Sequence, residues 1–126
     1  MTDLRNYLSL IRKSGDLKII KTKVSTKYEI AGITAKVDGS NAILFENIAE
    51  SDFNLVANLV GTRKRFAQAI GSTEEKIHEN MIFAIKKAKK PKIVSSGKYM
   101  ENKSRNISIM PIVTHFEKES GPFITS

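Results

Sequence analysis

Short apolar runs without polar alternation constrain the fold of this chain more than any other feature. Residues 41–46 (Asn-Ala-Ile-Leu-Phe-Glu) and 55–59 (Leu-Val-Ala-Asn-Leu) have no solvent-facing polar pattern. Such runs are typical of strands that are covered on both faces of a sheet. Residues 17–20 (Leu-Lys-Ile-Ile) predict a further strand, because β-branched side chains favour extended backbone. The chain therefore contains a small sheet with both faces covered.

The first helix is predicted over residues 2–13. Thr2 is a suitable N-cap, and Gly15 can adopt the left-handed conformation that ends a helix. Apolar residues lie on one face at positions i, i+4 and i+7, namely Leu4, Leu8 and Ile11.

Two capping boxes predict the starts of a second and a fourth helix. Thr26 and Glu29 are three residues apart, as are Ser72 and Glu75, so that each hydroxyl and carboxylate can satisfy backbone N–H groups of the first turn. Pro91 prevents the fourth helix from continuing. We expect this helix to turn one apolar face inward, made of Ile77, Met81, Ala84, Ile85 and Ala88.

A third helix is predicted after Gly61, with Thr62 as its cap. Its first turn carries three cations, Arg63, Lys64 and Arg65, although the helix dipole disfavours positive charge at this end. The pattern indicates that an anion, a carboxylate or a partner surface lies opposite, and a solvated helix face is the alternative. These three residues are our candidates for an interdomain or anion contact.

Together these segments predict an α+β fold, or α/β if the strands are parallel. A small mixed sheet is packed with about four helices and followed by an extended tail. The length of 126 residues suits one domain, 1–126, rather than two. We expect a compact core over residues 1–91 and an extended segment over residues 92–126.

The residue types available for chemistry are few. The chain has no cysteine, which excludes disulfides, thiolate metal sites and cysteine nucleophiles. His78 is interpreted as a surface residue, and His115 can pair with Glu117 without forming a catalytic set. We therefore assign no catalytic, cofactor-binding or metal-binding residue. No apolar run approaches the ~20 residues of a membrane span, so we expect a cytoplasmic protein without a membrane partner.

Positive charge is concentrated in the basic stretch, which we define as Lys86–Arg105. The formal net charge is +8, and this stretch alone contains eight basic residues and one acid. Lysines in the last turn of a helix interact favourably with its dipole, which requires no ligand. The alternative is a nucleic-acid-binding module that uses the basic stretch. The lysine run lacks interleaved aromatic residues and known motifs, so we do not expect nucleic acid as the partner.

Several stretches resemble, in order along the chain, the N-terminal domain of UbiD-type decarboxylases. Residues 3–10 and 14–17 resemble the family's first helix, glycine turn and first strand, and residues 28–31 (Tyr-Glu-Ile-Ala) resemble the start of its second helix. The remaining matches are residues 42–48 (Ala-Ile-Leu-Phe-Glu-Asn-Ile), 54–71, 111–117 (Pro-Ile-Val-Thr-His-Phe-Glu) and 121–125 (Gly-Pro-Phe-Ile-Thr). Together, the matches extend over nearly all of the chain.

The resemblance implies a carboxy-lyase that acts on an aromatic or α,β-unsaturated acid, with anhydromevalonate phosphate among the candidates. It also implies prenylated FMN, Mn²⁺ and K⁺ as cofactors of the complete enzyme. In the family, the metal-binding and catalytic residues follow the Gly-Pro passage, whereas this sequence stops at Ser126. The string at 105–108 (Arg-Asn-Ile-Ser) is similar to a metal-binding string of the family but precedes that passage, so we interpret it as coincidence.

We therefore expect the N-terminal domain or a small subunit of a UbiD-type carboxy-lyase, inactive alone and structural in its role. Its expected partner is the UbiD-type catalytic chain or domain, in a complete enzyme that is a homo-oligomer. The apolar ending at 122–126 favours a truncated gene, a split gene or an excised domain. A stand-alone scaffold protein is the alternative.

Overall fold

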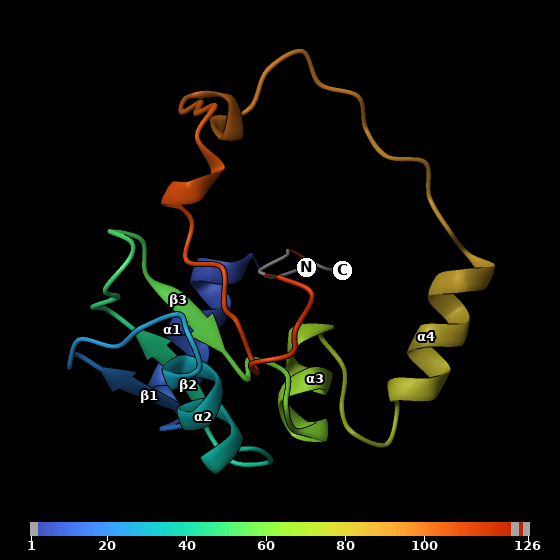
Figure 1. The fold of residues 1–126 in the computed structure, drawn as a ribbon. Helices are drawn as coiled ribbons and strands as arrows, with labels where there is room; N and C mark the ends of the chain where they lie inside the picture. Colours follow the sequence, from blue (N-terminus) through green and yellow to red (C-terminus); the bar gives the residue numbers. More distant parts are fainter. Residues whose placement is uncertain (1–2, 122–123, 125–126) are drawn as a thin grey trace.

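Three strands form a mixed sheet in the order β1-β2-β3 (Figure 1). In this computed structural model, which describes residues 3–121 and 124, β1 (Leu17–Ile20) pairs in parallel with β2 (Ala42–Phe45). β2 pairs antiparallel with β3 (Leu55–Ala57). A mixed sheet of three strands with four α-helices confirms the predicted α+β fold.

Helices α1 (Leu4–Lys13) and α2 (Glu29–Lys36) cover opposite faces of the sheet. Successive side chains of a strand point to opposite faces, so β2 contributes to two separate apolar clusters. The cluster beneath α2 consists of Val24, Ile30, Ile43, Phe45 and Ile48. The cluster beneath α1 consists of Tyr7, Ile11 and Ala42. The central strand is therefore covered on both faces, as its unbroken apolar run predicts.

Helix α1 is capped one residue later than predicted. Asp3 is the N-cap, and its Oδ1 accepts a hydrogen bond from the N–H of Asn6 at 2.9 Å. Thr2, the predicted cap, lies outside the described residues. Tyr7 is buried on this helix while Leu4 is exposed, because the helix turns a different edge of its apolar stripe toward the sheet.

The predicted capping box of α2 is shifted in register. The carboxylate of Glu29 accepts from the N–H of Ser25 at 2.7 Å, one residue before Thr26. The N–H of Thr26 is bonded to the carboxylate of Glu50 instead, at 2.9 Å. Tyr28 is the N-cap and makes no side-chain capping bond. The reciprocal carboxylate contact exists, but Thr26 is not the cap.

Tyr28 lies in a strained turn at the start of α2. Its φ of 71° and ψ of −32°, with a 2.9 Å hydrogen bond from the N–H of Glu29 to the carbonyl of Lys27, form a classic γ-turn, which is rare for a residue with a side chain. The N–H of Tyr28 donates to the carbonyl of Thr114 at 3.0 Å, and the N–H of Thr114 donates to the carbonyl of Thr26, also at 3.0 Å. The turn thus pairs with the returning tail.

Helix α3 (Arg63–Ala69) packs on the α1 side of the sheet, where Ala69 contacts the cluster around Tyr7. Its N-cap is Thr62, as predicted, and Thr62 Oγ1 accepts from the N–H of Arg65 at 3.2 Å. The longest helices have 10 residues. In the described part of the chain, none has both the length and the apolar character that crossing a bilayer requires.

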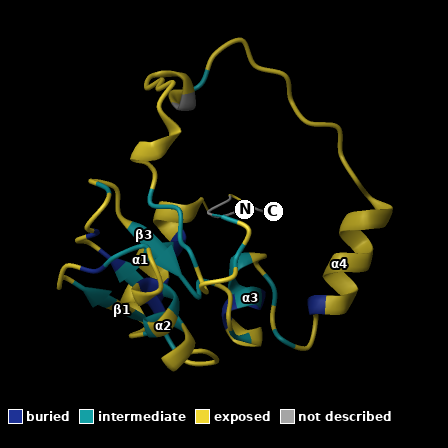
Figure 2. Cartoon of the chain, viewed as in Figure 1, coloured by how far each residue is buried: buried dark blue, intermediate teal, exposed yellow. Residues whose placement is uncertain are grey.

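Helix α4 (Ile77–Lys86) stands apart from the sheet. It lies at the far side of the arc, which is the wide stretch of chain between α3 and Thr114 (Figure 1). Ile77 is buried, but the rest of the helix is exposed (Figure 2). The prediction that Met81, Ala84, Ile85 and Ala88 face inward is therefore wrong for this chain, because no core element lies against them. Ala88 follows the helix, and α4 begins after the predicted capping box, with no side-chain cap.

The tail is extended, as predicted, with two single turns of 3₁₀ helix. These are η1 (Lys98–Met100) and η2 (Ile107–Ile109). After η2 the chain returns to the core and forms its backbone bridge with residue 27. The predicted boundary between a core and an extended segment at residue 91 stays a prediction.

Candidate functional site

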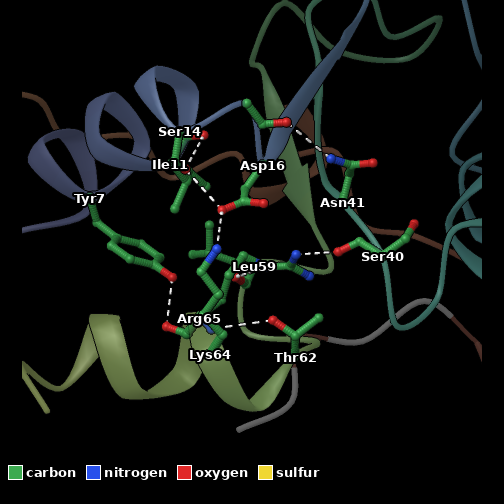
Figure 3. A network of polar contacts seen from close by, with 11 residues as sticks. Tyr7, Ile11, Ser14, Asp16, Ser40, Asn41, Leu59, Thr62, Lys64 and Arg65 are labelled. Carbon is green, nitrogen blue, oxygen red and sulfur yellow. Dashed lines mark hydrogen bonds and ion pairs between the residues drawn. The ribbon is translucent and has the colours of Figure 1, made fainter. Parts of the chain in front are cut away.

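Arg65 is the centre of a polar network that joins α3 to the rest of the core (Figure 3). Its side chain is buried, with 2% exposed. The guanidinium donates to the backbone carbonyl oxygens of Leu59 at 3.2 Å, Asn58 at 3.1 Å, and Ser40. Hydrogen bonds from a charged donor are strong, so an arginine is stable here without a carboxylate partner. Its donors are committed inside the domain.

Tyr7 fixes the other end of this network. Its hydroxyl donates to the carbonyl oxygen of Arg65 at 2.7 Å, which links α1 to α3. Burial raises the pKa of Tyr7, although the positive charge of Arg65 acts in the opposite direction. Tyr7 therefore remains a protonated donor at neutral pH. The network stabilises the packing of two helices and carries no free reactive group.

Asn58 holds the loop between β3 and α3 in a left-handed conformation, with a φ of 54°. Its Nδ2 donates to the carbonyls of Val37 at 3.1 Å and Asn41 at 2.9 Å. Asn58 thus contributes a carbonyl to Arg65 and ties the loop to the end of α2. Gly61 lies so close that a Cβ there would overlap the Asn58 side chain.

The two other cations of α3 lie at the surface. Lys64 Nζ is 3.6 Å from Asp16 Oδ2, and the guanidinium of Arg63 donates to the carbonyl of Glu74 at 3.3 Å. An exposed ion pair such as Lys64–Asp16 contributes little to stability, and the hydrogen bond of Arg63 is exposed too, so both side chains can exchange their present contacts for others. The interdomain or anion contact stays a proposal, and within the trio only Arg63 and Lys64 have donors facing solvent.

A large open groove lies between the sheet and the returning tail. Its volume is 1590 Å³, above the range of about 300–1,000 Å³ that is typical of small-molecule sites. One wall is formed by α2 and β3, and the other by residues 102–115. Apolar side chains such as Ile30, Leu55 and Ile109 dominate the lining. The groove has the size and apolar character of a surface for another polypeptide segment.

The histidines do not form a catalytic set. His115 Nδ1 lies 3.4 Å from Glu119 Oε1, and its backbone N–H donates to Glu119 Oε2 at 2.6 Å, so Glu119 rather than Glu117 is its partner. His78 is exposed in the first turn of α4. Among residues 3–121 and 124, no group of three or more His, Asp or Glu side chains could hold a metal ion.

The basic stretch is exposed along almost its entire length (Figure 2). Neither of the two ion pairs found in the described residues involves it, since these join Lys64 to Asp16 and His115 to Glu119. Its lysines therefore have no internal acidic partner in the part of the chain that the structure describes.

Comparison with known proteins identifies the family of the chain. Residues 8–85 match the sequence profile of the UbiD family's N-terminal domain, described as the 3-octaprenyl-4-hydroxybenzoate carboxy-lyase N-terminal domain. The chain belongs to the UbiD family. The match includes the whole cluster beneath α2 and all of α3, which confirms the resemblance seen in the sequence.

Two archaeal relatives of this UbiD N-terminal domain are anhydromevalonate phosphate decarboxylases. The protein from Methanosarcina mazei is 27% identical over 97% of the chain, and that from Methanothermobacter thermautotrophicus is 24% identical over 98%. The chain spans only 28% of the length of each. It therefore corresponds to less than a third of the relatives that it matches.

Solved structures give the same picture. The UbiD-class enzyme HmfF from Pelotomaculum thermopropionicum, an evolved dimeric form in complex with prFMN, superposes with a TM-score of 0.88 at 28% identity. This superposition covers 100% of the present chain and 31% of HmfF. The vanillic acid decarboxylase of Sedimentibacter hydroxybenzoicus in its closed form has the same fold, with a TM-score of 0.78 at 21% identity.

Sequence reasoning missed the residues that build the polar network. Arg63, Lys64 and Arg65 share one helical turn, so the charge pattern predicts one contact for all three. Successive side chains of a helix point in different directions, and Arg65 points into the core. Tyr7 lies on the apolar face of α1 and was passed over in favour of the aliphatic residues. Asn58, three residues before Gly61, carried a usable signal, because both residue types favour turns with unusual backbone angles.

Proposed function

We propose that this chain is the N-terminal domain, or a separate small subunit, of a UbiD-type carboxy-lyase and that its role is structural. The observation that carries the proposal is the match of residues 8–85 to the family's N-terminal domain. The buried network of Arg65 supports a structural role, since its donors stabilise the fold and face no open cavity. The open apolar groove supports packing against further polypeptide.

The proposed reaction of the complete enzyme is the non-oxidative decarboxylation of an α,β-unsaturated or aromatic acid. The names of the two archaeal relatives make anhydromevalonate phosphate the first substrate to test. Prenylated FMN supplies the carbon chemistry when bound, and Mn²⁺ and K⁺ complete the proposed cofactor set. The described residues provide no metal donor set, so we assign these groups to the portion of the family that this chain does not span.

The remaining features of the proposal concern assembly and location. We propose a UbiD-type catalytic chain or domain as the partner, in a homo-oligomer of the complete enzyme within the cytoplasm. We also propose that this chain shapes one wall of the reaction site. The exposed positions of Arg63 and Lys64 in the first turn of α3 are compatible with this role.

The direct test is CO₂ release from anhydromevalonate phosphate with prenylated FMN, Mn²⁺ and K⁺. We expect no release by the purified 126-residue chain and release when the UbiD-type catalytic polypeptide is present. Omitting this chain from the second reaction is expected to lower its rate. Release by the chain alone contradicts the proposal, and an unchanged rate without it favours the stand-alone scaffold alternative.

Exposure of the basic stretch favours one second candidate, nucleic-acid binding. This function requires an affinity whose logarithm falls by roughly 0.9 per phosphate contact for each tenfold rise in salt on B-DNA. We expect only weak binding at two salt concentrations. Tight, steeply salt-dependent binding would replace the structural proposal.

A further inference from the structure

Helix α4 has almost no packing partner within the described chain. Ile77 in its first turn is buried, but the following apolar residues are open to solvent, with 63% of Phe83 and 75% of Ile85 exposed. Figure 1 shows the helix at the far side of the arc, and Figure 2 shows the same helix exposed beyond its first turn. The apolar residues of α4 after its first turn are therefore uncovered.

The exposed apolar residues lie on opposite sides of α4. Each residue advances a helix by about 100°, so Met81 and Ile85 share one side, while Phe83 lies about 160° from Ile85. A helix that is apolar around most of its circumference is normally buried. A flat surface would cover only one of the two sides, so α4 fits a groove with two walls.

The length of α4 also indicates that another surface covers this helix. An isolated helix shorter than about 12–15 residues is marginal in water, and most helix stability in proteins comes from packing of an apolar face. α4 has 10 residues and no side-chain cap. Its helical state therefore depends on a surface outside the core described above.

Charge limits which surface can cover α4. The basic stretch begins in the last turn of the helix, where Lys86 and Lys87 are followed by Lys89, Lys90 and Lys92, all exposed. A parallel contact with α4 of a second copy of this chain would bring the same lysines close together, and like charges oppose such a contact. An acidic margin beside an apolar groove is the complementary surface.

The shape of the arc links this surface to the UbiD family. α4 and the basic stretch have few contacts with the core, yet the whole chain superposes on HmfF with a TM-score of 0.88. HmfF contains more than twice as much polypeptide beyond the matched 31%. The arc thus has the conformation found in a protein that also carries the remaining portion of a UbiD-class enzyme.

We propose that α4 inserts into a two-walled apolar groove of the UbiD-type catalytic portion, with acidic residues at the groove's end contacting Lys86–Lys92. The inference rests on the proposed function and adds the docking element and the character of its receptor. Met81 and Ile85 contact one wall and Phe83 contacts the other. The open groove between the sheet and the returning tail is a separate surface from α4.

Photo-crosslinking in the cells that make this protein tests the proposal. The full chain carries p-benzoylphenylalanine at position 83, 85 or 116, the last being an exposed residue of the returning tail outside α4. We expect crosslinked peptides from positions 83 and 85 that belong to a UbiD-type catalytic portion, on two different segments of it. Links to a second copy, to nucleic acid or to an unrelated protein overturn the inference.

The third position separates this inference from the proposed function. A link to the catalytic portion from position 116 but from neither α4 position overturns the docking of α4 and leaves the proposed function standing. No link to a UbiD-type catalytic portion from any of the three positions contradicts both.

Replacing a single apolar residue of α4 by lysine tests each of the two proposed groove walls. We expect Phe83→Lys and Ile85→Lys each to reduce the amount of catalytic polypeptide that co-purifies at least about tenfold, because each buries an unpaired charge. Leu4→Lys, at an exposed apolar residue of α1 outside α4, is the matched control and is expected to stay within about twofold. Circular dichroism checks that the core remains folded. Loss in only one of the two variants overturns the two-walled groove.

Discussion

At the scale of single residues, the decisive feature is a buried arginine, Arg65, that has no ion-pair partner among the residues the structure describes. Arg65 donates to three carbonyl oxygens, two in the loop between β3 and α3 (Asn58 and Leu59) and one, of Ser40, in the loop between α2 and β2. The planar guanidinium, with five donors in a fixed geometry, is suited to such convergent acceptors. The residue type is therefore dictated by the loop geometry, and not by a ligand.

Removing the guanidinium leaves these carbonyls unpaired in the interior. We expect Arg65→Met to lower the free energy of unfolding by about 3 kcal/mol or more, since each unsatisfied buried polar group costs about 1–3 kcal/mol. Arg65→Lys is expected to lie between this variant and the wild type, because an ammonium group reaches fewer of the acceptors. Urea unfolding followed by circular dichroism measures the difference.

Lys64→Met is the control for this comparison. It removes the neighbouring cation, whose ion pair with Asp16 is exposed, and is expected to change the free energy of unfolding by less than about 1 kcal/mol. A loss as large as that of Arg65→Met would show that charge on α3, rather than the buried network, stabilises the domain.

The hydrogen bonds of the Glu50 carboxylate predict how the free energy of unfolding changes as the pH falls. The Ser25 hydroxyl and then the Thr26 N–H, which donate to its carboxylate, lower the pKa of Glu50. A carboxylate with a lowered folded-state pKa stabilises the fold above its unfolded pKa of about 4.3, and this stability is lost as pH falls through the folded-state pKa. We expect Glu50→Gln to show a smaller drop in unfolding free energy between about pH 5 and pH 3 than the wild type.

The site is exposed, so the difference at pH 6 is expected to be under about 1 kcal/mol. Denaturant titrations at each pH give the measurement, with the exposed Glu46→Gln as control. An identical acid response in the wild type and Glu50→Gln contradicts the assigned role of the carboxylate.

At the scale of elements, sequence periodicity predicted the sheet well and the helix starts less well. The runs at 17–20, 41–46 and 55–59 correspond to β1, β2 and β3 within two residues at each end. Within the fold β2 is mostly buried and most residues of β1 and β3 are half-buried, so the local pattern and the tertiary structure agree. The start of α2 was misplaced because the backbone of Thr26 pairs with the tail, and no local pattern encodes a partner so distant in sequence.

The prediction for α4 failed for a different reason. Its apolar residues do call for burial, but the surface that buries them is not in the core that this chain forms. For the candidate site, the position of Arg63 and Lys64 at the surface was accessible from the sequence. The inward direction of Arg65 was not, because it depends on carbonyl groups contributed by three separate loop positions.

Two glycines that look alike in sequence have opposite structural roles. Gly32 lies inside α2 with open space around the position of a Cβ, so Gly32→Ala is expected to raise the free energy of unfolding by about 0.5–1 kcal/mol. Gly61→Ala is expected to lower it by about 1–3 kcal/mol, because the new methyl group overlaps an Asn58 side chain held by two hydrogen bonds.

Thermal and urea unfolding of the two variants form a matched pair, since both make the same chemical change. If Gly61→Ala were as stable as the wild type, the Asn58 side chain would be free to move, and its bonds to the carbonyls of Val37 and Asn41 would not anchor the loop.

At the scale of the whole molecule, stability is unevenly distributed. The β2 strand lies between two apolar clusters, whereas the chain from α4 to η2 is exposed and has few contacts with the core. Regions with little buried apolar surface open with small free energies, and core strands open only with global unfolding. The domain therefore combines a stable three-layered core with a segment whose order depends on association.

Hydrogen exchange measures this contrast directly. In the chain alone we expect amides of residues 79–106 to exchange within seconds, while amides of Ile43 and Phe45 remain protected by a free energy close to that of global unfolding. Slow exchange at Phe83 in the isolated monomeric chain contradicts the view that α4 is ordered by a partner. Protection of α4 after addition of the catalytic polypeptide, with β2 unchanged, is the expected second result.

The backbone pairing of Thr26 and Tyr28 with Thr114 closes the arc at its base. A ring of chain anchored at both ends samples far fewer orientations than a dangling terminus of the same length. Association then sacrifices less freedom of movement, so that even modest contacts along the arc suffice to hold it in position. The strained turn at Tyr28, which carries one of these backbone bonds, thereby limits the freedom of the arc before any association.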